Sequence, residues 1–460
     1  VIYRMYGDNS STGLGSGFVT YDRGPDHQQD DDDPGVRLLT ASEYATTLAD
    51  GAGGVLSTIA NTKLSTAVAG INSATRVNTL LLEDNGSVSG AGMLTVESGL
   101  IMSTGSNGAI DAAGLATGTG GAVRLITPEA TDQLTVSSAI GSGVTAGLIK
   151  SGEGTAVLTG TNAYSGTTYL ANGALRATDG VSLPANSTVH FTGGVLEGAG
   201  TFTRSLGTGG ANVRWDEHNS GGFAANGGVF NIQLNGGTGA VTWDNTAYFV
   251  QGHRNLILGS ATADNVVALQ NALALGTFDV ASGDRTDNTF RTIEVIDNPN
   301  STTDLARLSG AVTGTDARLT LVKTGDGTLE LAGPNTYSIA TTVAEGTLLV
   351  TSSTGSGPVE VNDGATLAGS GTVTGATTVA AGGALAPGAG PGILTLNGGL
   401  TLAEEATLAV ELGGATPGLY DQANVTGAVS LGTGAAGTEL ILTLYGGFSP
   451  AAFDQFVIVE

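Results

Sequence analysis

Short runs in which apolar residues alternate with small polar residues recur along almost the whole chain, and Gly, Asn or Asp interrupts them. The strings GTLEL, TTVAEGTLLV and ATLAVEL are examples. Alternation with a period of two is typical of β-strands, whereas apolar residues at helical spacing are almost absent. Residues 41–68 come closest to a helical pattern, but Gly51, Gly53 and Gly54 interrupt it. The pattern therefore predicts an all-β protein built from many short strands.

One segment of this pattern occurs twice. Residues 148–178 align with residues 321–351 without a gap, and 15 of the 31 positions are identical. An internal repeat of this kind indicates a repeated structural unit, so we interpret its shared residues as turn and packing positions. Ile339 replaces Gly166, and we expect the two copies to differ in shape there. The shared residues that we assign to the structure of the repeat are Gly152, Gly154, Asn162, Tyr164, Gly325, Gly327, Asn335 and Tyr337.

Strands at such short intervals are compatible with a sandwich, a barrel or a β-solenoid. The solenoid is favoured because the rhythm persists without a break, and because aromatic residues, at 5%, are too few to fill many separate cores. We predict a right-handed parallel β-helix, since parallel crossovers are almost always right-handed, with coils of about 20–25 residues. We expect an irregular acidic segment over residues 1–40 and a continuous β-helix over residues 41–460. Its repeat units lie near residues 148–203 and 321–374.

A family resemblance rests on the pattern G-x-G-T-x-x-L-x-G-x-N-x-Y-S at residues 152–165 and 325–338. Each copy is followed by G-A-L or G-T-L, and together they resemble the autotransporter-associated β-strand repeat. The string LAPGAGPGILTLNGGLTL at residues 385–402 is similar to an element that commonly follows such repeats in bacterial surface proteins. The resemblance implies a secreted or cell-surface β-helical passenger or fibre protein that is not an enzyme.

Charge and composition exclude several classes of function. The net charge is −25, and the 16 Lys and Arg residues are scattered singly along the chain. They cannot form the basic surface that nucleic acids require, and anionic membranes are disfavoured for the same reason. No apolar run approaches the length of a transmembrane helix, about 20 residues, so we expect no transmembrane segment in this chain. The absence of Cys excludes disulfides, thiol catalysis and Cys-ligated zinc.

The densest charge in the chain is the string DHQQDDDDPG near the N-terminus. Asp30, Asp31, Asp32 and Asp33 are candidate ligands for Ca²⁺, which prefers oxygen ligands. The alternative is a solvated loop whose charges repel one another. Calcium is the candidate metal, and we expect no other cofactor.

Both Trp residues of the chain are followed by Asp, in the pairs Trp215–Asp216 and Trp243–Asp244. An exposed pair of this kind can bind a sugar, because the ring stacks on it and the carboxylate accepts its hydroxyl hydrogens. The alternative is that both rings pack between neighbouring coils and that the Asp residues open turns.

Histidine chemistry is not supported by spacing. His27, His190, His218 and His253 lie far apart and match no metal-binding motif, and we expect His190 to face solvent. The triplet of Asp216, Glu217 and His218 cannot converge on one glycosidic bond, because neighbouring residues of a strand point to opposite faces. We therefore expect no catalytic residues.

Two classes of function stay open. The first is a structural segment of an extracellular fibre, surface layer or adhesin that self-assembles, because a β-helix ends in rungs with unpaired backbone groups. The alternative is a polysaccharide-active β-helix enzyme or phage-type depolymerase, which needs carboxylates and basic residues clustered on neighbouring coils, or a monomeric glycan-binding adhesin. The expected partners are further copies of the chain and surface glycans.

Overall fold

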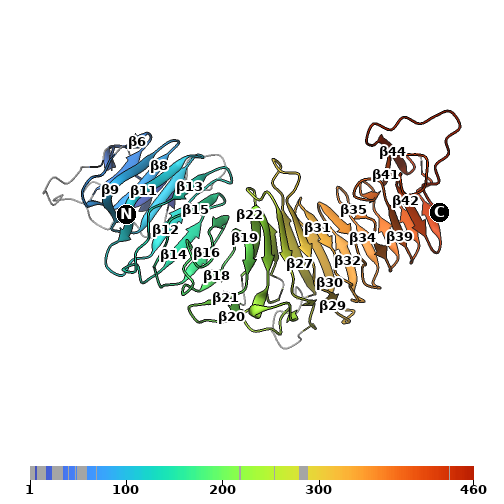
Figure 1. Ribbon diagram of the computed structural model, residues 1–460, viewed down its shortest axis with the longest axis horizontal. Helices are drawn as coiled ribbons and strands as arrows, with labels where there is room; N and C mark the ends of the chain where they lie inside the picture. The colour runs from blue at the N-terminus through green and yellow to red at the C-terminus, as the bar shows by residue number, and fades with distance from the viewer. Residues whose placement is uncertain are drawn as a thin grey trace. The chain divides into compact units, whose positions relative to one another are not determined.

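The computed structural model describes residues 6–7, 17–22, 35–39, 41–46, 48, 60–68, 70–216, 219–252, 254–278, 289–434 and 436–460. Within these residues the chain is all-β and forms a parallel β-helix (Figure 1). Each turn of the β-helix, called a coil below, contributes one strand to each of two or three sheets. The helical segments among the described residues are two short 3₁₀ turns, Ala41–Glu43 and Leu234–Gly236. The predicted fold class is confirmed.

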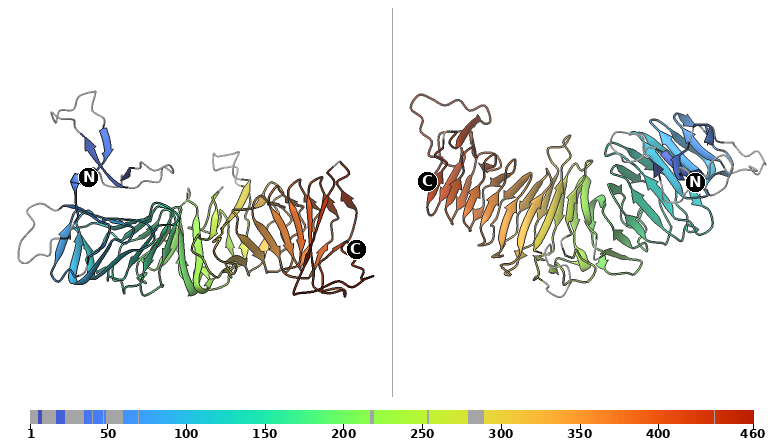
Figure 2. Two further views of the ribbon diagram at one scale, coloured as in Figure 1. Left: turned by 90° about the horizontal axis from the view of Figure 1, so that it is seen from above. Right: turned by 180° about the vertical axis from the view of Figure 1, so that it is seen from behind.

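The chain divides into two compact units. The first comprises Val1–Gly198 and Thr208–Arg214, and the second comprises Ala199–Gly207 and Trp215–Glu460. Figure 2 shows the stacked strands of each unit from two further sides. The chain enters the second unit within β19 (Val195–Phe202), returns to the first after β20 (Ser205–Leu206) and enters the second again at the end of β21 (Asn212–Trp215).

The first unit carries two parallel sheets. Near the N-terminus, three further strands pair antiparallel: β1 (Tyr6–Gly7), β2 (Gly17–Asp22) and β3 (Gly35–Leu38). The first parallel sheet contains β4 (Tyr44–Ala45), β5 (Asn61–Leu64), β8 (Thr79–Glu83), β10 (Leu100–Thr104), β12 (Val123–Ile126), β14 (Leu148–Ser151), β16 (Thr168–Leu170) and β18 (Val189–Phe191). The second contains β6 (Ala67–Val68), β7 (Thr75–Val77), β9 (Ser87–Val96), β11 (Gly108–Thr117), β13 (Gln133–Val136), β15 (Thr155–Leu158), β17 (Ala174–Arg176) and the start of β19.

The second unit has the same architecture with additional short sheets. One row of strands contains β22 (Gly221–Ile232), β24 (Leu256–Gly259), β27 (Phe290–Ile296), β30 (Thr320–Thr324), β32 (Ala340–Val343), β34 (Val359–Val361), β37 (Thr377–Val379), β40 (Leu400–Leu402) and β43 (Val429–Leu431). The other contains β25 (Val266–Leu269), β28 (Leu305–Leu308), β31 (Thr328–Leu331), β33 (Thr347–Val350), β35 (Thr366–Gly369), β38 (Ala384–Pro387), β41 (Thr407–Leu412) and β44 (Glu439–Leu444). Two three-stranded sheets consist of β23 (Val241–Thr242), β26 (Leu273–Ala274) and β29 (Val312–Thr313), and of β36 (Thr372–Val373), β39 (Ile393–Leu396) and β42 (Gln422–Val425).

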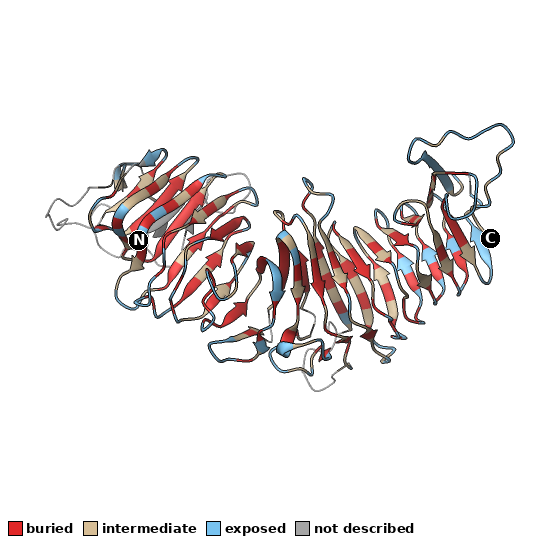
Figure 3. Ribbon diagram, in the orientation of Figure 1, coloured by how far each residue is buried: buried red, intermediate tan, exposed pale blue. Residues whose placement is uncertain are grey.

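Ladders of identical aliphatic residues form the interior of the coils. Alternate residues of each strand point inward, and parallel pairing places like residues above one another about 4.8 Å apart. In the second unit, Leu329, Leu348, Leu367, Leu385 and Leu408 lie in register on successive coils and are all buried. Figure 3 shows this alternation of buried and less buried residues along the strands. Full burial of each leucine contributes about 1.5–3 kcal/mol, so such ladders hold the coils together.

Coil length varies more than the sequence indicates. Val359 pairs with Thr377 on the next coil, whereas Val266 pairs with Leu305, so the second of these coils is about twice as long as the first. The predicted coil length is therefore wrong for the coils between residues 221 and 308. The additional residues form the sheet of β23, β26 and β29, and buried aromatic side chains such as Phe223, Trp243 and Phe249 fill these wider coils.

Candidate functional site

The repeated segments begin with a strand, β14 in the first copy and β30 in the second, followed by a tight glycine turn. Gly152 has φ +80° and Gly325 has φ +75°, a region that favours glycine. A Cβ atom at Gly152 would lie 2.1 Å from the Thr127 carbonyl oxygen of the preceding coil. Glycine is therefore required at this turn by the backbone conformation and by the close approach of the neighbouring coil. Two residues later, a Cβ atom at Gly154 or Gly327 would also meet the preceding coil closely.

Each repeat also contains a buried lysine. The Lys150 ammonium donates hydrogen bonds to the carbonyl oxygens of Ser151, Gly152 and Asn172, at 2.9, 2.7 and 3.1 Å. In the second copy, Lys323 donates to the carbonyl oxygens at residues 324, 325 and 345, at 3.0, 2.5 and 3.0 Å. Both side chains are almost completely buried. Each ammonium thus joins the glycine turn of its own coil to the following coil.

The shared Asn of the repeat connects three coils. The side-chain oxygen of Asn162 accepts a hydrogen bond from the Ile140 amide at 2.8 Å, and its amide group donates to the Ser182 carbonyl at 2.6 Å. Asn335 makes the same two bonds at 2.7 Å each, to Val312 and to Ser353. Because the partners lie on the coils before and after, each Asn replaces a missing backbone pair between them.

The shared Tyr is buried completely. The Tyr164 hydroxyl lies 2.8 Å from the Thr168 hydroxyl, and the Tyr337 hydroxyl accepts a hydrogen bond from Thr341 at 3.0 Å. Burial raises the pKa of Tyr337. The Lys, Asn and Tyr residues of both repeats therefore bond to the protein interior and present no reactive group to solvent.

The buried lysines make the stability of the β-helix depend on pH. Burial lowers the pKa of Lys150 to about 7 and that of Lys323 to about 8, although nearby carboxylates such as Asp132 partly oppose the shift. Between the folded pKa and the unfolded value of 10.5, the unfolded chain binds more protons than the folded chain. The free energy of unfolding therefore rises with pH in this window, by up to about 1.4 kcal/mol per pH unit for each lysine. For Lys150, the burial penalty is largest at and below a pH of about 7.

The Lys150→Met variant tests this prediction. Urea unfolding followed by circular dichroism from pH 6 to 9.5 should show that the wild type gains stability over the variant as pH rises. A constant difference between the two proteins across that range would contradict the prediction.

The two Trp–Asp pairs lie in the second unit, where the structure excludes stacking of a sugar on either ring. Trp215 and Trp243 are 1% and 0% exposed. The ring centres of Trp215 and Trp243 lie 5.4 and 6.2 Å from the ring centre of Phe249, and both contacts are edge to face. The alternative interpretation, packing between coils, describes these rings correctly. They are buried because the wide coils of this unit need large side chains in their interior.

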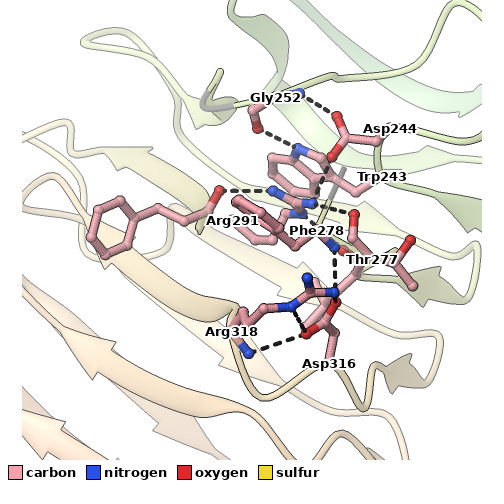
Figure 4. Close-up of polar contacts among 10 residues, drawn as sticks. Trp243, Asp244, Gly252, Thr277, Phe278, Arg291, Asp316 and Arg318 are labelled. Atoms are coloured by element: carbon pink, nitrogen blue, oxygen red, sulfur yellow. Dashed lines mark hydrogen bonds and ion pairs between the residues drawn. The ribbon is translucent and has the colours of Figure 1, made fainter. Parts of the chain in front are cut away.

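Asp244 takes part in a buried ion pair (Figure 4). One carboxylate oxygen lies 2.6 Å from Nη2 of Arg291, which is completely buried, and the other accepts a hydrogen bond from the Gly252 amide. The Arg291 guanidinium also donates to the carbonyl oxygens of Leu275 at 2.8 Å and Phe290 at 3.2 Å. Burial lowers the pKa of Arg291, and the Asp244 carboxylate opposes that shift. The guanidinium thereby connects segments that are up to 47 residues apart in the sequence.

A second ion pair lies beside the first. Arg318 donates two hydrogen bonds to the Asp316 carboxylate, at 2.8 and 2.5 Å, and its guanidinium lies 4.9 Å from the centre of the Phe278 ring. These contacts hold the pKa of Asp316 well below its usual range and raise that of Arg318. The Phe278 amide donates to Asp316 as well, so this pair fixes the end of the segment that precedes residue 279.

His190 is buried, so the prediction that it faces solvent is wrong. It lies on β18 directly beside Tyr169 of β16, and the two ring centres are 4.9 Å apart. Nη2 of Arg214 lies 3.3 Å from its Nδ1. The sequence pattern placed His190 on the outer face of its strand, and these two side chains cover it there.

The remaining candidates divide into those outside and those within the described residues. The four candidate calcium ligands, Asp30, Asp31, Asp32 and Asp33, lie outside the described residues, so calcium binding stays a prediction. Outside them too are Glu217, His218, His27 and His253. Within the described part of the chain, no group of three or more His, Asp or Glu residues could hold a metal ion. Asp216 is described, and its carbonyl oxygen accepts a hydrogen bond from the Asn219 amide in a turn.

Sequence reasoning missed two features of these sites. The buried ion pair of Asp244 and Arg291 joins distant segments, and no local pattern indicates it. The buried lysines carried a signal, because Lys150 and Lys323 are identical positions in a repeat with few charged residues. A charge retained among packing residues indicates burial with satisfied hydrogen bonds.

Comparisons with known proteins agree with the geometry of the repeats. Residues 148–177 and 321–350 each match the model of the passenger-associated-transport-repeat family, so the resemblance to autotransporter-associated repeats is confirmed. No curated protein sequence matches the chain. In the part of the chain that the structure describes, no helix has the length and apolar character needed to cross a membrane.

Proposed function

We propose that this chain is a structural, non-enzymatic segment of a bacterial surface-displayed passenger protein and that it self-associates through one open rung of its second unit. The open rung consists of β43 (Val429–Leu431) and β44 (Glu439–Leu444). Two passenger-associated transport repeats support surface display. The exposure of the open rung is the observation that carries self-association.

The open rung continues the internal ladders of the β-helix. Leu440 lies in register on Leu408, yet it is 47% exposed, whereas Leu408 is 6% exposed. Leu431 lies in register on Leu402 and is 52% exposed. All residues of both strands are exposed, and they include further large apolar side chains at Val429, Ile441, Leu442 and Leu444. Except for Ile441, these apolar residues pair with buried residues of the preceding coil, so core positions of that coil are continued by exposed residues here.

Covering this rung is energetically favourable. Full burial of a leucine or isoleucine contributes about 1.5–3 kcal/mol, and several such residues lie together on the open rung. An exposed apolar strand also attracts further strand pairing. The same rung of a second copy offers a matching apolar surface, because a two-fold interface uses one patch on both subunits. We therefore assign a second copy of this chain as its partner.

Sedimentation velocity over a range of protein concentrations tests self-association. The wild type should form dimers or larger assemblies as concentration rises, and negative-stain microscopy should show joined particles. The double variant Leu440→Lys/Leu442→Lys should stay monomeric, because charged side chains oppose burial of the rung. Val181→Lys is the matched control, since Val181 is 45% exposed and lies in the first unit. A wild type that stays monomeric at every concentration overturns the proposal.

An enzyme of the polysaccharide-active class would need carboxylates and a basic residue together in one groove. Among the described residues, the large groove of the first unit is lined by one charged residue, Arg124, and by no carboxylate. No observation on the described residues therefore favours catalysis over a structural role.

A further inference from the structure

The chain contains six asparagines that are followed directly by glycine. They are Asn85, Asn107, Asn172, Asn226, Asn235 and Asn397. In such a pair the backbone nitrogen of the glycine can attack the side-chain carbonyl carbon of the asparagine, because glycine has no side chain to hinder the approach. Asn226, Asn235 and Asn397 are each followed by two glycines, so their local sequences are the same. A large difference in reactivity among these three must therefore come from the fold.

At Asn226 the fold holds both groups that would have to react. The side-chain amide of Asn226 donates a hydrogen bond to the Thr262 carbonyl oxygen at 2.7 Å. The Gly227 amide, which would supply the attacking nitrogen, donates to the Asp264 carboxylate at 2.7 Å. Both hydrogen bonds must break before the nitrogen can reach the carbonyl carbon, and breaking them slows the reaction.

Hydrogen bonds also hold four other asparagines of the set by their side chains. The side chains of Asn85 and Asn107 bond to each other at 3.0 Å, the side-chain oxygen of Asn235 accepts from the Leu206 amide at 3.0 Å, and that of Asn172 accepts from the Gly173 amide at 2.8 Å. Five of the six side chains thus have a defined orientation, and turning any of them costs a hydrogen bond.

Asn397 differs from the other five. It lies in the turn between β39 and β40, and both Asn397 and Gly398 are exposed. Its backbone amide donates to the Val373 carbonyl oxygen at 2.9 Å, which anchors the start of the turn. Among the described residues, none forms a hydrogen bond with the Asn397 side chain or with the Gly398 amide. Both reacting groups are therefore accessible to each other and to water.

From this comparison we propose that Asn397 is a modification site, at which the folded chain converts spontaneously to aspartate and isoaspartate. The Gly398 nitrogen forms a bond to Cγ of Asn397, and Nδ2 leaves as ammonia with the proton of the Gly398 amide. Water then opens the resulting succinimide. Cleavage of its bond to Cγ gives aspartate, and cleavage of its bond to the backbone carbonyl carbon gives isoaspartate. The reaction takes up one water, releases one ammonia and needs no oxidant or reductant.

Isoaspartate adds one carbon atom to the backbone of this turn. The turn leads into β40, where Leu400 and Leu402 pair with Val429 and Leu431 of the open rung. The additional atom therefore lies directly before the strand that supports the open rung, and we expect it to loosen β40. The modification itself does not depend on self-association.

Peptide mass spectrometry of the 460-residue chain, incubated at a mildly alkaline pH, tests the modification. The mass change from Asn to Asp should appear at Asn397 at least tenfold faster than at Asn226 or Asn235, and labelling by an isoaspartyl methyltransferase should identify the isoaspartate. In the chain unfolded in urea, these three asparagines should convert at similar rates. Equal rates in the folded chain overturn the proposal, as does an Asn397 that converts only after unfolding.

Two variants separate the effect of the fold from that of the sequence. Asp264→Ala removes the acceptor of the Gly227 amide and should accelerate conversion at Asn226 at least threefold, whereas an unchanged rate would overturn the role of the hydrogen bonds. Asn397→Gln should abolish the fast reaction, because its longer side chain would have to close a six-membered ring. Replacement of Gly398 is not a suitable control, since a Cβ atom there would lie 2.3 Å from the Ala376 amide nitrogen.

Hydrogen exchange tests the effect on β40. The fully converted chain should exchange faster than the wild type at residues 400–402. Asn397→Asp supplies the new charge without the additional backbone atom and should exchange as the wild type does. Equal exchange in the converted chain and in Asn397→Asp would overturn the expected loosening of β40.

Discussion

Replacing Asp244 with asparagine is expected to lower the free energy of unfolding of the second unit by about 3–5 kcal/mol. The change removes the carboxylate that pairs with the buried Arg291 guanidinium, 2.6 Å away. Asparagine keeps an acceptor for the Gly252 amide and tolerates the φ of +66° at this position. Denaturation followed by tryptophan fluorescence measures the effect, because Trp215 and Trp243 are both buried in this unit.

Two further variants separate the ion pair from general damage. Arg318→Gln removes the more exposed neighbouring pair with Asp316 and should have a much smaller effect. The double variant Asp244→Asn/Arg291→Met should be more stable than Asp244→Asn alone, because it leaves no buried guanidinium without its partner. If Asp244→Asn is as stable as the wild type, the ion pair does not hold the wide coils together.

Replacing Gly166 with isoleucine, the residue of the second repeat, should destabilise the first unit by at least about 1–3 kcal/mol. A Cβ atom at Gly166 would lie 2.3 Å from the Gly147 amide nitrogen and 2.4 Å from the Ala146 carbonyl carbon. Those atoms belong to the backbone of the preceding coil, so they cannot move aside as a side chain can. Hydrogen exchange of peptides covering residues 140–190 measures the loss, which should leave the tryptophan fluorescence of the second unit unchanged.

Two glycines of the preceding coil provide the control for this variant. A Cβ atom at Gly141 or Gly143 would meet no atom within 4 Å, so Gly141→Ala and Gly143→Ala should be nearly neutral. In the second copy, Ile339→Ala should lower the free energy of unfolding by about 2–5 kcal/mol, because Ile339 is 1% exposed and its truncation leaves a cavity. Equal exchange in Gly166→Ile and the wild type would mean that the coils can separate locally at little cost.

The two copies of the repeat differ at this position, as the substitution of Gly166 by Ile339 indicated. In the second copy β30 and β32 begin at Thr320 and Ala340, whereas in the first β14 and β16 begin one aligned position later. The sequence identified where the copies diverge. It could not show that the backbone of the preceding coil is the reason, since contacts between coils join residues that are far apart along the chain.

The alternating pattern and the repeat were sufficient for the fold class, because strand periodicity and glycine turns are local properties of the chain. They also assigned the shared Asn and Tyr to structure, and both are buried in each copy. The length of each coil could not be predicted in this way, because it depends on which strands pair with one another. The pattern is the same in the short coil that joins Val359 to Thr377 and in the long coil that joins Val266 to Leu305.

Tertiary structure alone decided the chemistry of the individual side chains. The sequence determined that Trp243 is followed by Asp, but burial between wide coils made the ring a core residue and its neighbour the partner of Arg291. Likewise, Arg124, Ile149 and Tyr169 are well separated in the sequence and become one row only when parallel pairing stacks their strands. The physical reason is that a solenoid forms its surfaces and its interior across coils, whereas sequence patterns report along them.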